Sequence, residues 1–290
     1  MPQAVVPADP SAAMVGQCAV HPLAASVTAI DRVVDWVSFR LLDPIGTDWT
    51  SCDHALSDPA CFTRWRAALA QQLAQQHSHV PEQTTAAHVL QWYLGIPTHL
   101  GAMLFHSARR VPSLHPGQLA FRLDLARVQE VALRPGRFWC LPGDPDAGHP
   151  DATPVPDEVA LAAVLRSQVV AHAARFLEVY GPMVRFGRRT LWAAVTDVLD
   201  VNLLRAGRSF GSAQAGATDA RLVLAERENP FTSASTTCEM TDEHGRTHWI
   251  RRRGWCCFTY ALPEVEHPCA SCPRVSDAER VRILGTLDPS

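Results

Sequence analysis

The stretch DEVALAAVLRSQVVAHAARFLEVYGP, residues 157–182, indicates most clearly what kind of fold this chain adopts. Its apolar residues recur at helical spacing until Gly181-Pro182, which predicts one long helix over 157–180. The same spacing predicts a second long helix over 186–205. The side chains expected to face inward from the first helix are Leu161, Val164, Leu165, Val169, Phe176 and Tyr180.

Shorter patterns on either side complete the expected fold. Helical spacing predicts further helices over 26–42, over 85–110 with a kink near Pro97, and over 219–228. Two more helices are expected to begin at capping residues, one at Asp58 and one at the capping box of Ser276 and Glu279. Alternating apolar residues predict strands within 118–141 and a β-hairpin over 236–252. The expected class is therefore α+β, predominantly helical, with a small antiparallel sheet and a C-terminal segment that carries a cysteine motif.

A loop rich in Pro, Gly and Asp at 141–158 is the best candidate for a boundary between regions. We expect a disordered lead over 1–18. The remaining divisions are an N-terminal helical and β region over 19–145, a helical region over 146–230, and a region over 231–290. The last of these holds the β-hairpin and the C-terminal cysteine motif. These three can equally form one continuous domain.

Composition limits the possible functions. The chain is 47% apolar with a net charge of −3, which argues against nucleic acid or an anionic membrane as a partner. No run of apolar residues is long enough for an integral membrane segment, and the N-terminus lacks the pattern of an export signal. We expect a cytoplasmic protein, and cysteines in that compartment stay reduced.

The segment RRRGWCCFTYALPEVEHPCASCP, residues 251–273, gathers Cys256, Cys257, Cys269 and Cys272. A disulfide between the adjacent pair is disfavoured, because their Cα atoms lie about 3.8 Å apart and a relaxed disulfide needs about 4.4–6.8 Å. Four thiolates suit either structural Zn²⁺ or a [2Fe–2S] cluster. Adjacent cysteines in an extended chain point to opposite faces, so one ion requires a bend, for which Gly254 is the candidate. Two irons are easier for such a pair to reach.

The pattern Cys256-Cys257…Cys269-Ala-Ser-Cys272-Pro273 resembles the ferric siderophore reductases of the FhuF type, which carry a C-terminal CC…CxxC motif. Eleven residues separate the pairs here, one more than is usual in the family. The resemblance implies that the four cysteines bind one [2Fe–2S] cluster. It further implies one-electron reduction of a ferric siderophore, of the hydroxamate type, and a ferredoxin-type electron donor. The chain shows no Gly-rich dinucleotide fingerprint in a strand-to-helix setting, which agrees with such a donor.

Basic and aromatic residues surround the motif. Positive charge beside an anionic cluster stabilises its reduced form, and it can also attract an acidic ferredoxin. Aromatic rings can shield a cluster or flank a chelate, although strand aromatics often belong to the core. The candidates for contact with substrate or donor are Arg251, Arg252, Arg253, Trp255, Arg189 and Trp192.

Three other residues are alternative ligands for the same site. Cys238 lies on the opposite strand of the predicted hairpin, and His248 and His267 bracket the cysteine motif. The alternative function is a siderophore-binding or regulatory protein in which the four cysteines hold structural zinc, without catalysis. An iron–sulfur sensor that binds nucleic acid is a third hypothesis, and the mild net charge argues against it.

Overall fold

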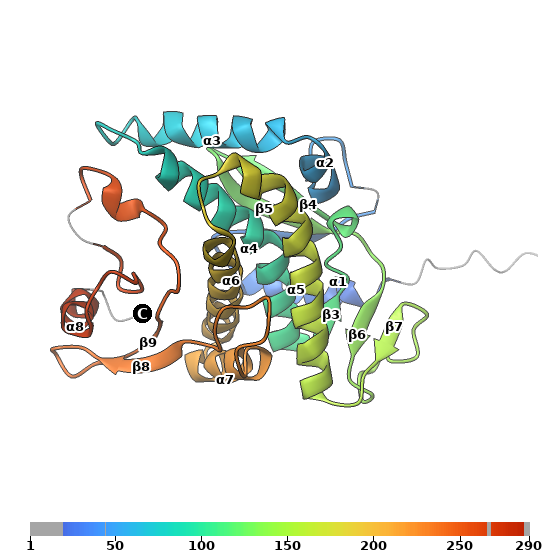
Figure 1. The fold of residues 1–290 in the computed structure, drawn as a ribbon. Coiled ribbons are helices and arrows are strands. Elements are labelled where there is room, and N and C mark those ends of the chain that lie inside the picture. Colours follow the sequence, from blue (N-terminus) through green and yellow to red (C-terminus); the bar gives the residue numbers. More distant parts are fainter. Residues whose placement is uncertain (1–19, 44, 266–267, 287–290) are drawn as a thin grey trace, which may run out of the picture.

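The computed structural model describes residues 20–43, 45–265 and 268–286, and long helices dominate it (Figure 1). The predicted α+β class with mainly helical content is confirmed. The expected lead over 1–18 lies outside the described residues. None of the helices in the described ranges combines the length and apolar character needed to cross a bilayer.

Three long helices, α4, α5 and α6, form the centre of the molecule (Figure 1), and shorter helices cover their ends. The α-helices are α1 (Leu23–Val33), α2 (Cys52–Ser57), α3 (Ala60–Leu73), α4 (Glu82–Ala108), α5 (Glu158–Tyr180), α6 (Arg188–Ser209), α7 (Ala213–Val223) and α8 (Asp277–Gly285). The 3₁₀ helices are η1 (Pro116–Gln118), η2 (Gly181–Met183) and η3 (Thr259–Ala261).

An aromatic cluster holds α3, α4 and α5 together. Phe62 of α3 and Phe176 of α5 both pack on Tyr93 of α4, with ring centroids 5.3 and 4.1 Å away. Each of these rings is fully buried. Aromatic pairs of this kind contribute about 1 kcal/mol each beyond the area that they bury. The buried faces of α4 and α6 pack against each other, which fixes the scaffold on which the C-terminal segment lies.

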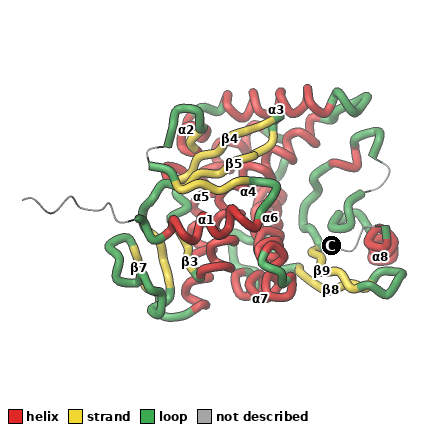
Figure 2. The backbone as a smooth tube through the Cα atoms, turned by 180° about the vertical axis from the view of Figure 1, so that it is seen from behind, coloured by secondary structure: helices red, strands yellow, loops and turns green. Residues whose placement is uncertain are grey.

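Three small sheets flank the helices, and Figure 2 shows β4 and β5 lying across them. The strands are β1 (Ser38–Leu41), β2 (Thr50–Ser51), β3 (Arg110–Pro112), β4 (Leu119–Asp124), β5 (Arg127–Leu133), β6 (Phe138–Cys140), β7 (Ala152–Pro154), β8 (Thr237–Thr241) and β9 (Thr247–Arg251). The sheet orders are β1-β5-β4-β2, β3-β6-β7 and β8-β9. Most pairs are antiparallel, but β1 runs parallel to β5 and β6 parallel to β7.

Two predicted helices have different bounds in the structure. The helix expected over 26–42 ends at Val33, because the chain turns and continues as β1 beside β5. Asp31 of the helix stabilises this turn by accepting a 2.7 Å hydrogen bond from the Phe39 amide. The helix expected over 219–228 instead spans Ala213–Val223, because Ser212 caps its N-terminus through the Ala215 amide.

One hydrophobic core runs through the molecule from Leu23 to Cys257. It therefore crosses both of the expected region boundaries, at 145 and at 230. A smaller apolar cluster of Cys272, Val275 and Ile283 lies under α8. The C-terminal segment thus joins the main core at its first cysteine pair and has a small core of its own at the second.

The contact between α6 and α7 depends on two glycines. A methyl group at Gly207 would lie 2.3 Å from the amide nitrogen of Gly216, far inside van der Waals contact. We predict that Gly207→Ala lowers the free energy of unfolding by about 3 kcal/mol or more, because the two backbones must separate. Gly95→Ala in α4, where the methyl group meets nothing within 4 Å, should leave stability unchanged or raise it.

Urea unfolding of both variants checks this prediction. Equal stability of the Gly207 variant and the unchanged chain would contradict the close helix packing.

Candidate metal centre

The first cysteine pair is attached to helix α6 through Asp197. The buried carboxylate of Asp197 accepts hydrogen bonds from the amides of Gly254 and Trp255, at 2.9 and 3.1 Å. Burial raises its pKa to about 6, against the opposing effects of Arg251 and the two amides. The chain bends at Gly254 and Trp255, as the sequence predicted for Gly254.

A second change of direction follows the pair at Phe258. This residue has a φ of 58°, which is uncommon for a residue with a side chain. Its amide donates to the Cys256 sulfur at 3.4 Å, and its carbonyl accepts from the Thr84 hydroxyl of α4 at 3.0 Å. The adjacent cysteines are therefore not in an extended strand, and their side chains are free to approach a common centre.

The CxxC pair is held by a tight turn and by one arginine. The Cys272 amide donates to the Cys269 carbonyl at 2.9 Å, which closes the turn. Arg280 of α8, only 3% exposed, donates to the carbonyls of Ala270, Cys272 and Val275. The turn is thus fixed by a buried guanidinium that replaces three solvent hydrogen bonds.

The structure brings Cys257 of the first pair into contact with Cys269 of the second, across nine described intervening residues and the undescribed residues 266–267. A hydrogen bond from the Cys269 thiol holds the pKa of Cys257 far below its usual value, and His88 supports this shift while burial opposes it. The pKa of Cys269 rises for the same reason. Cys256 lies near both Cys257 and Cys272, and burial, the largest cause, raises its pKa. The surroundings of the Cys257 sulfur thus favour its deprotonated form, which is the form in which a cysteine binds metal.

The donor set fits a thiolate-bound metal group. Tetrahedral Zn²⁺ needs every pair of its four sulfurs about 3.8 Å apart, given Zn–S bonds of about 2.3 Å. No three of these four sulfurs, all of which the structure describes, lie within 4.8 Å of one another. In a [2Fe–2S] cluster each iron binds two of the four sulfurs, so the four sulfurs need not all surround one point.

Two residues beside the sulfurs were not predicted from the sequence. His88 of α4 contacts Cys257 and also lies 3.0 Å from the Thr259 hydroxyl, which itself is 3.2 Å from the Cys257 sulfur. His88 lies about 170 residues before this segment, so no local motif could have indicated it, whereas Thr259 lies only two residues after Cys257. Their hydrogen bonds reach the sulfur directly, which is how a protein adjusts the electronic properties of a thiolate ligand.

The three arginines that precede the motif occupy three different environments. Arg251 is buried, with its guanidinium 3.8 Å from the Asp197 carboxylate. Arg252 is half exposed and pairs with Asp277 at 2.9 Å. Arg253 lies beside the cysteines. Burial lowers its pKa, but the interactions with Cys257 and Cys269 outweigh burial and raise it. Arg253 alone among them lies beside the sulfurs.

The other candidate contacts lie elsewhere. Trp255 is buried in the core, and Trp192 is also buried there. Arg189 is exposed on the first turn of α6. Among the alternative ligands, Cys238 is paired across the hairpin with Ile250, and His248 bonds to Asp242 at 2.8 Å. His267 lies outside the described residues.

A second group of potential ligands lies far from the cysteines in the sequence. The side chains of His21, His149 and Asp151 are mutually within 4.8 Å, and the distances between these positions hide the group from a motif search. The Nδ1 atoms of the two histidines accept hydrogen bonds from the amides of Leu23 and Asp151. The Nε2 of His21 lies 3.4 Å from the Asp151 carboxylate and meets the criteria for a hydrogen bond with no described residue.

The role of Arg280 can be tested by metal affinity. We predict that Arg280→Gln weakens binding of iron or Zn²⁺ by about 10–100-fold, because the CxxC carbonyls lose their shared donor. Competition with a chromogenic chelator measures this affinity. Arg282→Gln, on the exposed side of the same helix, is the control and should match the unchanged protein. Equal affinity in both variants would show that Arg280 does not organise the site.

The chain matches no protein-family model, and no curated protein matches it at a significant level. The likeness to ferric siderophore reductases therefore depends on the cysteine spacing and its residues alone.

Proposed function

We propose that this protein is a ferric siderophore reductase that uses one [2Fe–2S] cluster. Cys256, Cys257, Cys269 and Cys272 would hold the cluster, which would supply a single electron to Fe³⁺ in a bound chelate. Ferrous iron binds the oxygen donors of a siderophore more weakly, so reduction releases it for the cell. The observation that supports this proposal best is the contact of Cys257 with Cys269, one from each cysteine pair, with Arg253 beside them.

The surrounding residues have clear tasks in such a reaction. Asp197 and Arg280 fix the two ends of the cysteine segment, so the ligands stay in place when the charge at the centre changes. His88 and Thr259 provide polar contacts to the Cys257 sulfur. Arg253 offers positive charge where reduction adds negative charge. No general acid or base is required, because the step moves one electron and breaks no covalent bond of the chelator.

The proposed electron donor is a ferredoxin-type protein in the cytoplasm. Cys269 is the exposed member of the four cysteines, so the centre lies close to the protein surface. Arg252 lies nearby on that surface, and its pairing with Asp277 leaves it half exposed. An acidic donor can approach this side of the molecule. The hydroxamate class of the chelate comes from the family resemblance.

Structural zinc remains the second candidate. The rigid CxxC turn under Arg280 is a suitable half-site for one ion. A zinc protein would bind a siderophore or a regulator without transferring electrons.

Anaerobic purification separates these functions. We predict a red-brown protein with equal amounts of iron and acid-labile sulfide, and with an EPR signal after reduction. Serine at any one of Cys256, Cys257, Cys269 or Cys272 should remove or destabilise this chromophore, because each supplies a ligand. Cys238→Ser is the matched control and should keep it. A colourless, zinc-loaded protein would reject the proposal, and loss of the chromophore only in the Cys238 variant would change the ligand set.

The charge of Arg253 should affect the reduction potential. We predict that Arg253→Gln makes the potential more negative, because a cation beside Cys257 stabilises the reduced centre. Redox titration followed by EPR measures the shift. Arg252→Gln should leave the potential unchanged and slow reduction by ferredoxin at low salt, because it alters surface charge. Equal potentials in the Arg253 variant and the unchanged protein would contradict the assigned position of this residue.

A further inference from the structure

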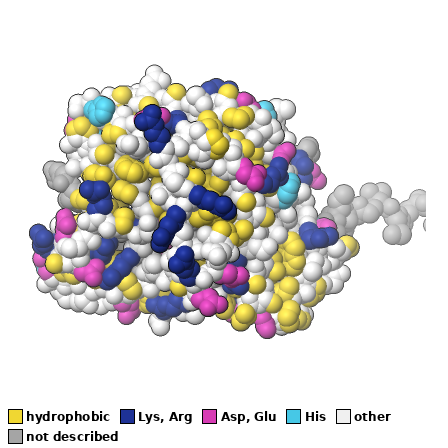
Figure 3. All heavy atoms as spheres, viewed as in Figure 1, with side chains coloured by type: hydrophobic (Ala, Val, Ile, Leu, Met, Phe, Trp, Pro, Cys, Tyr) yellow, Lys and Arg dark blue, Asp and Glu magenta, His cyan; other side chains and the backbone are white. Residues whose placement is uncertain are grey.

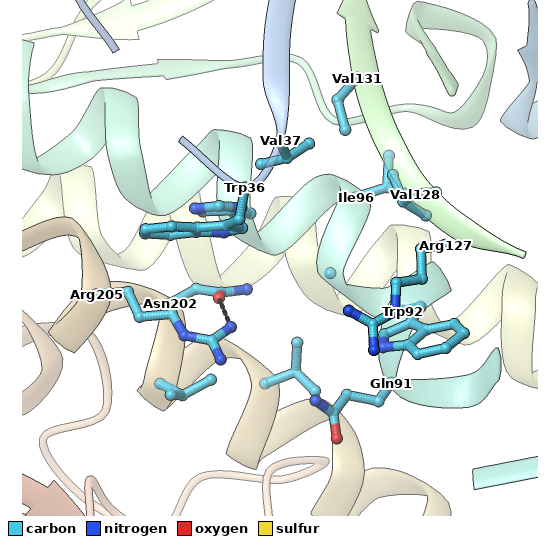
Figure 4. Close-up of a pocket in the computed structure, with 14 residues that line it drawn as sticks. Trp36, Val37, Gln91, Trp92, Ile96, Arg127, Val128, Val131, Asn202 and Arg205 are labelled. Carbon is cyan, nitrogen blue, oxygen red and sulfur yellow. Dashed lines mark hydrogen bonds between the residues drawn. The ribbon is translucent and has the colours of Figure 1, made fainter. Parts of the chain in front are cut away.

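A pocket of about 320 Å³ lies between α4, α6 and strand β5, and none of the proposed ligands lines it. Figure 4 shows Arg127 beside Trp92 on one side of the pocket, and Trp36 with Arg205 on the other. A neighbouring pocket of about 640 Å³ also contacts Trp36 and Arg205, so the two adjoin. Ligand sites in proteins commonly have about 300–1,000 Å³.

Positive charge in and beside this pocket has no acidic partner. Within the described part of the chain, no carboxylate forms an ion pair with Arg127, Arg205 or Arg208. Enclosure by the protein, and then the like charges of Arg253 and Arg208, lower the pKa of Arg205. An anion in the pocket would relieve this repulsion. Further arginine side chains lie among apolar side chains on the face of the molecule that Figure 3 shows.

Aromatic and imidazole groups give the pocket further binding capacity. The guanidinium of Arg127 lies 5.9 Å from the ring centre of Trp92. The ring of Trp36, 46% exposed, stacks on His99 with centroids 5.7 Å apart. His99 itself is only 7% exposed, and its Nε2 has no hydrogen-bond partner among the described residues. A buried polar atom without a partner in the wall of a pocket is suited to a polar ligand group.

The pocket is connected to the cysteines by two chains of contact. The ring of Trp92 lies 5.4 Å from the ring of His88, which contacts Cys257. On the other side, Arg205 is close enough to Arg253 for their charges to interact, and Arg253 faces the same sulfur. A molecule in the pocket is therefore separated from the Cys257 sulfur by two side chains on each route.

We infer that this pocket holds the ferric chelate, and that its arginines and exposed indole rings select an anionic chelate with catecholate rings over a neutral hydroxamate. The inference rests on the proposed function and replaces the hydroxamate class that the family resemblance implies. Guanidinium groups bind anionic oxygen ligands through charge-assisted hydrogen bonds, and indole rings pack on flat aromatic rings. A chelate larger than the first pocket extends past Trp36 and Arg205 into the second.

Gallium complexes test the inference without any electron transfer, because Ga³⁺ is not reduced. The probes are a tripodal tris-catecholate complex, which is triply anionic, and a neutral tripodal tris-hydroxamate complex on the same scaffold. Isothermal titration of the purified protein should show at least about tenfold tighter binding of the catecholate complex, as expected for a charged hydrogen bond. Equal or tighter binding of the hydroxamate complex would overturn the inference.

Two variants show whether the preference comes from this pocket. Arg205→Gln and Arg127→Gln should each weaken catecholate binding about tenfold and change hydroxamate binding little. Arg127 is exposed on β5, so its variant remains informative even if Arg205→Gln destabilises the fold. Arg64→Gln removes an exposed arginine that pairs with Asp58 on another surface, and it should bind as the unchanged protein does. Unaltered binding in both pocket variants would place the chelate elsewhere.

Failure of this inference differs from failure of the proposed function. Protein that reduces ferric chelates but binds both gallium complexes equally would keep the reductase and reject the selectivity. Protein that binds the catecholate complex as predicted but contains no redox-active iron would keep the pocket and reject the reductase.

Discussion

The bond between the Asp197 carboxylate and the amides of Gly254 and Trp255 is the contact on which the functional part of this structure depends. It attaches the C-terminal segment to helix α6, and the first cysteine pair follows it directly. A buried carboxylate is costly unless its charge is compensated. Here two amides and Arg251 provide the compensation, although burial still raises the pKa of Asp197 to about 6. The contact that holds the first cysteine pair in place therefore carries an electrostatic cost, which is the burial of a carboxylate.

The CxxC pair is held by a different set of hydrogen bonds. Arg280 satisfies three carbonyls of the CxxC segment from the small helix α8, and the Arg253 amide donates to the Ser271 carbonyl at 3.1 Å. The bond from Arg253 to Ser271 connects the segments of the two cysteine pairs through backbone atoms. The four sulfurs lie at the junction of the long-helix core and the smaller C-terminal cluster. A centre at such a junction is near the surface and near the pocket between α4 and α6.

Much of the fold could be predicted from the sequence, because its helices carry strong local signals. The helix over 157–180 and the capping box at Ser276 match the structure closely, since periodicity and capping act within a few residues. The helix expected over 26–42 was wrong in its second half, where pairing of β1 with β5 outweighs a helical pattern. His88, Arg280 and Asp197 were not foreseen, because they reach the cysteines through tertiary packing. Among the three adjacent arginines, only the fold distinguishes Arg253 from its neighbours.

The most direct test of this account is X-ray absorption at the iron edge of the protein purified without oxygen. We predict a first shell of sulfur atoms only and a second scatterer at the short separation typical of two sulfide-bridged irons. This result would show a binuclear iron centre with sulfur ligands, as expected if Cys256, Cys257, Cys269 and Cys272 hold it. A single zinc surrounded by four sulfurs, with no iron absorption, would contradict the account and leave the cysteines a structural role.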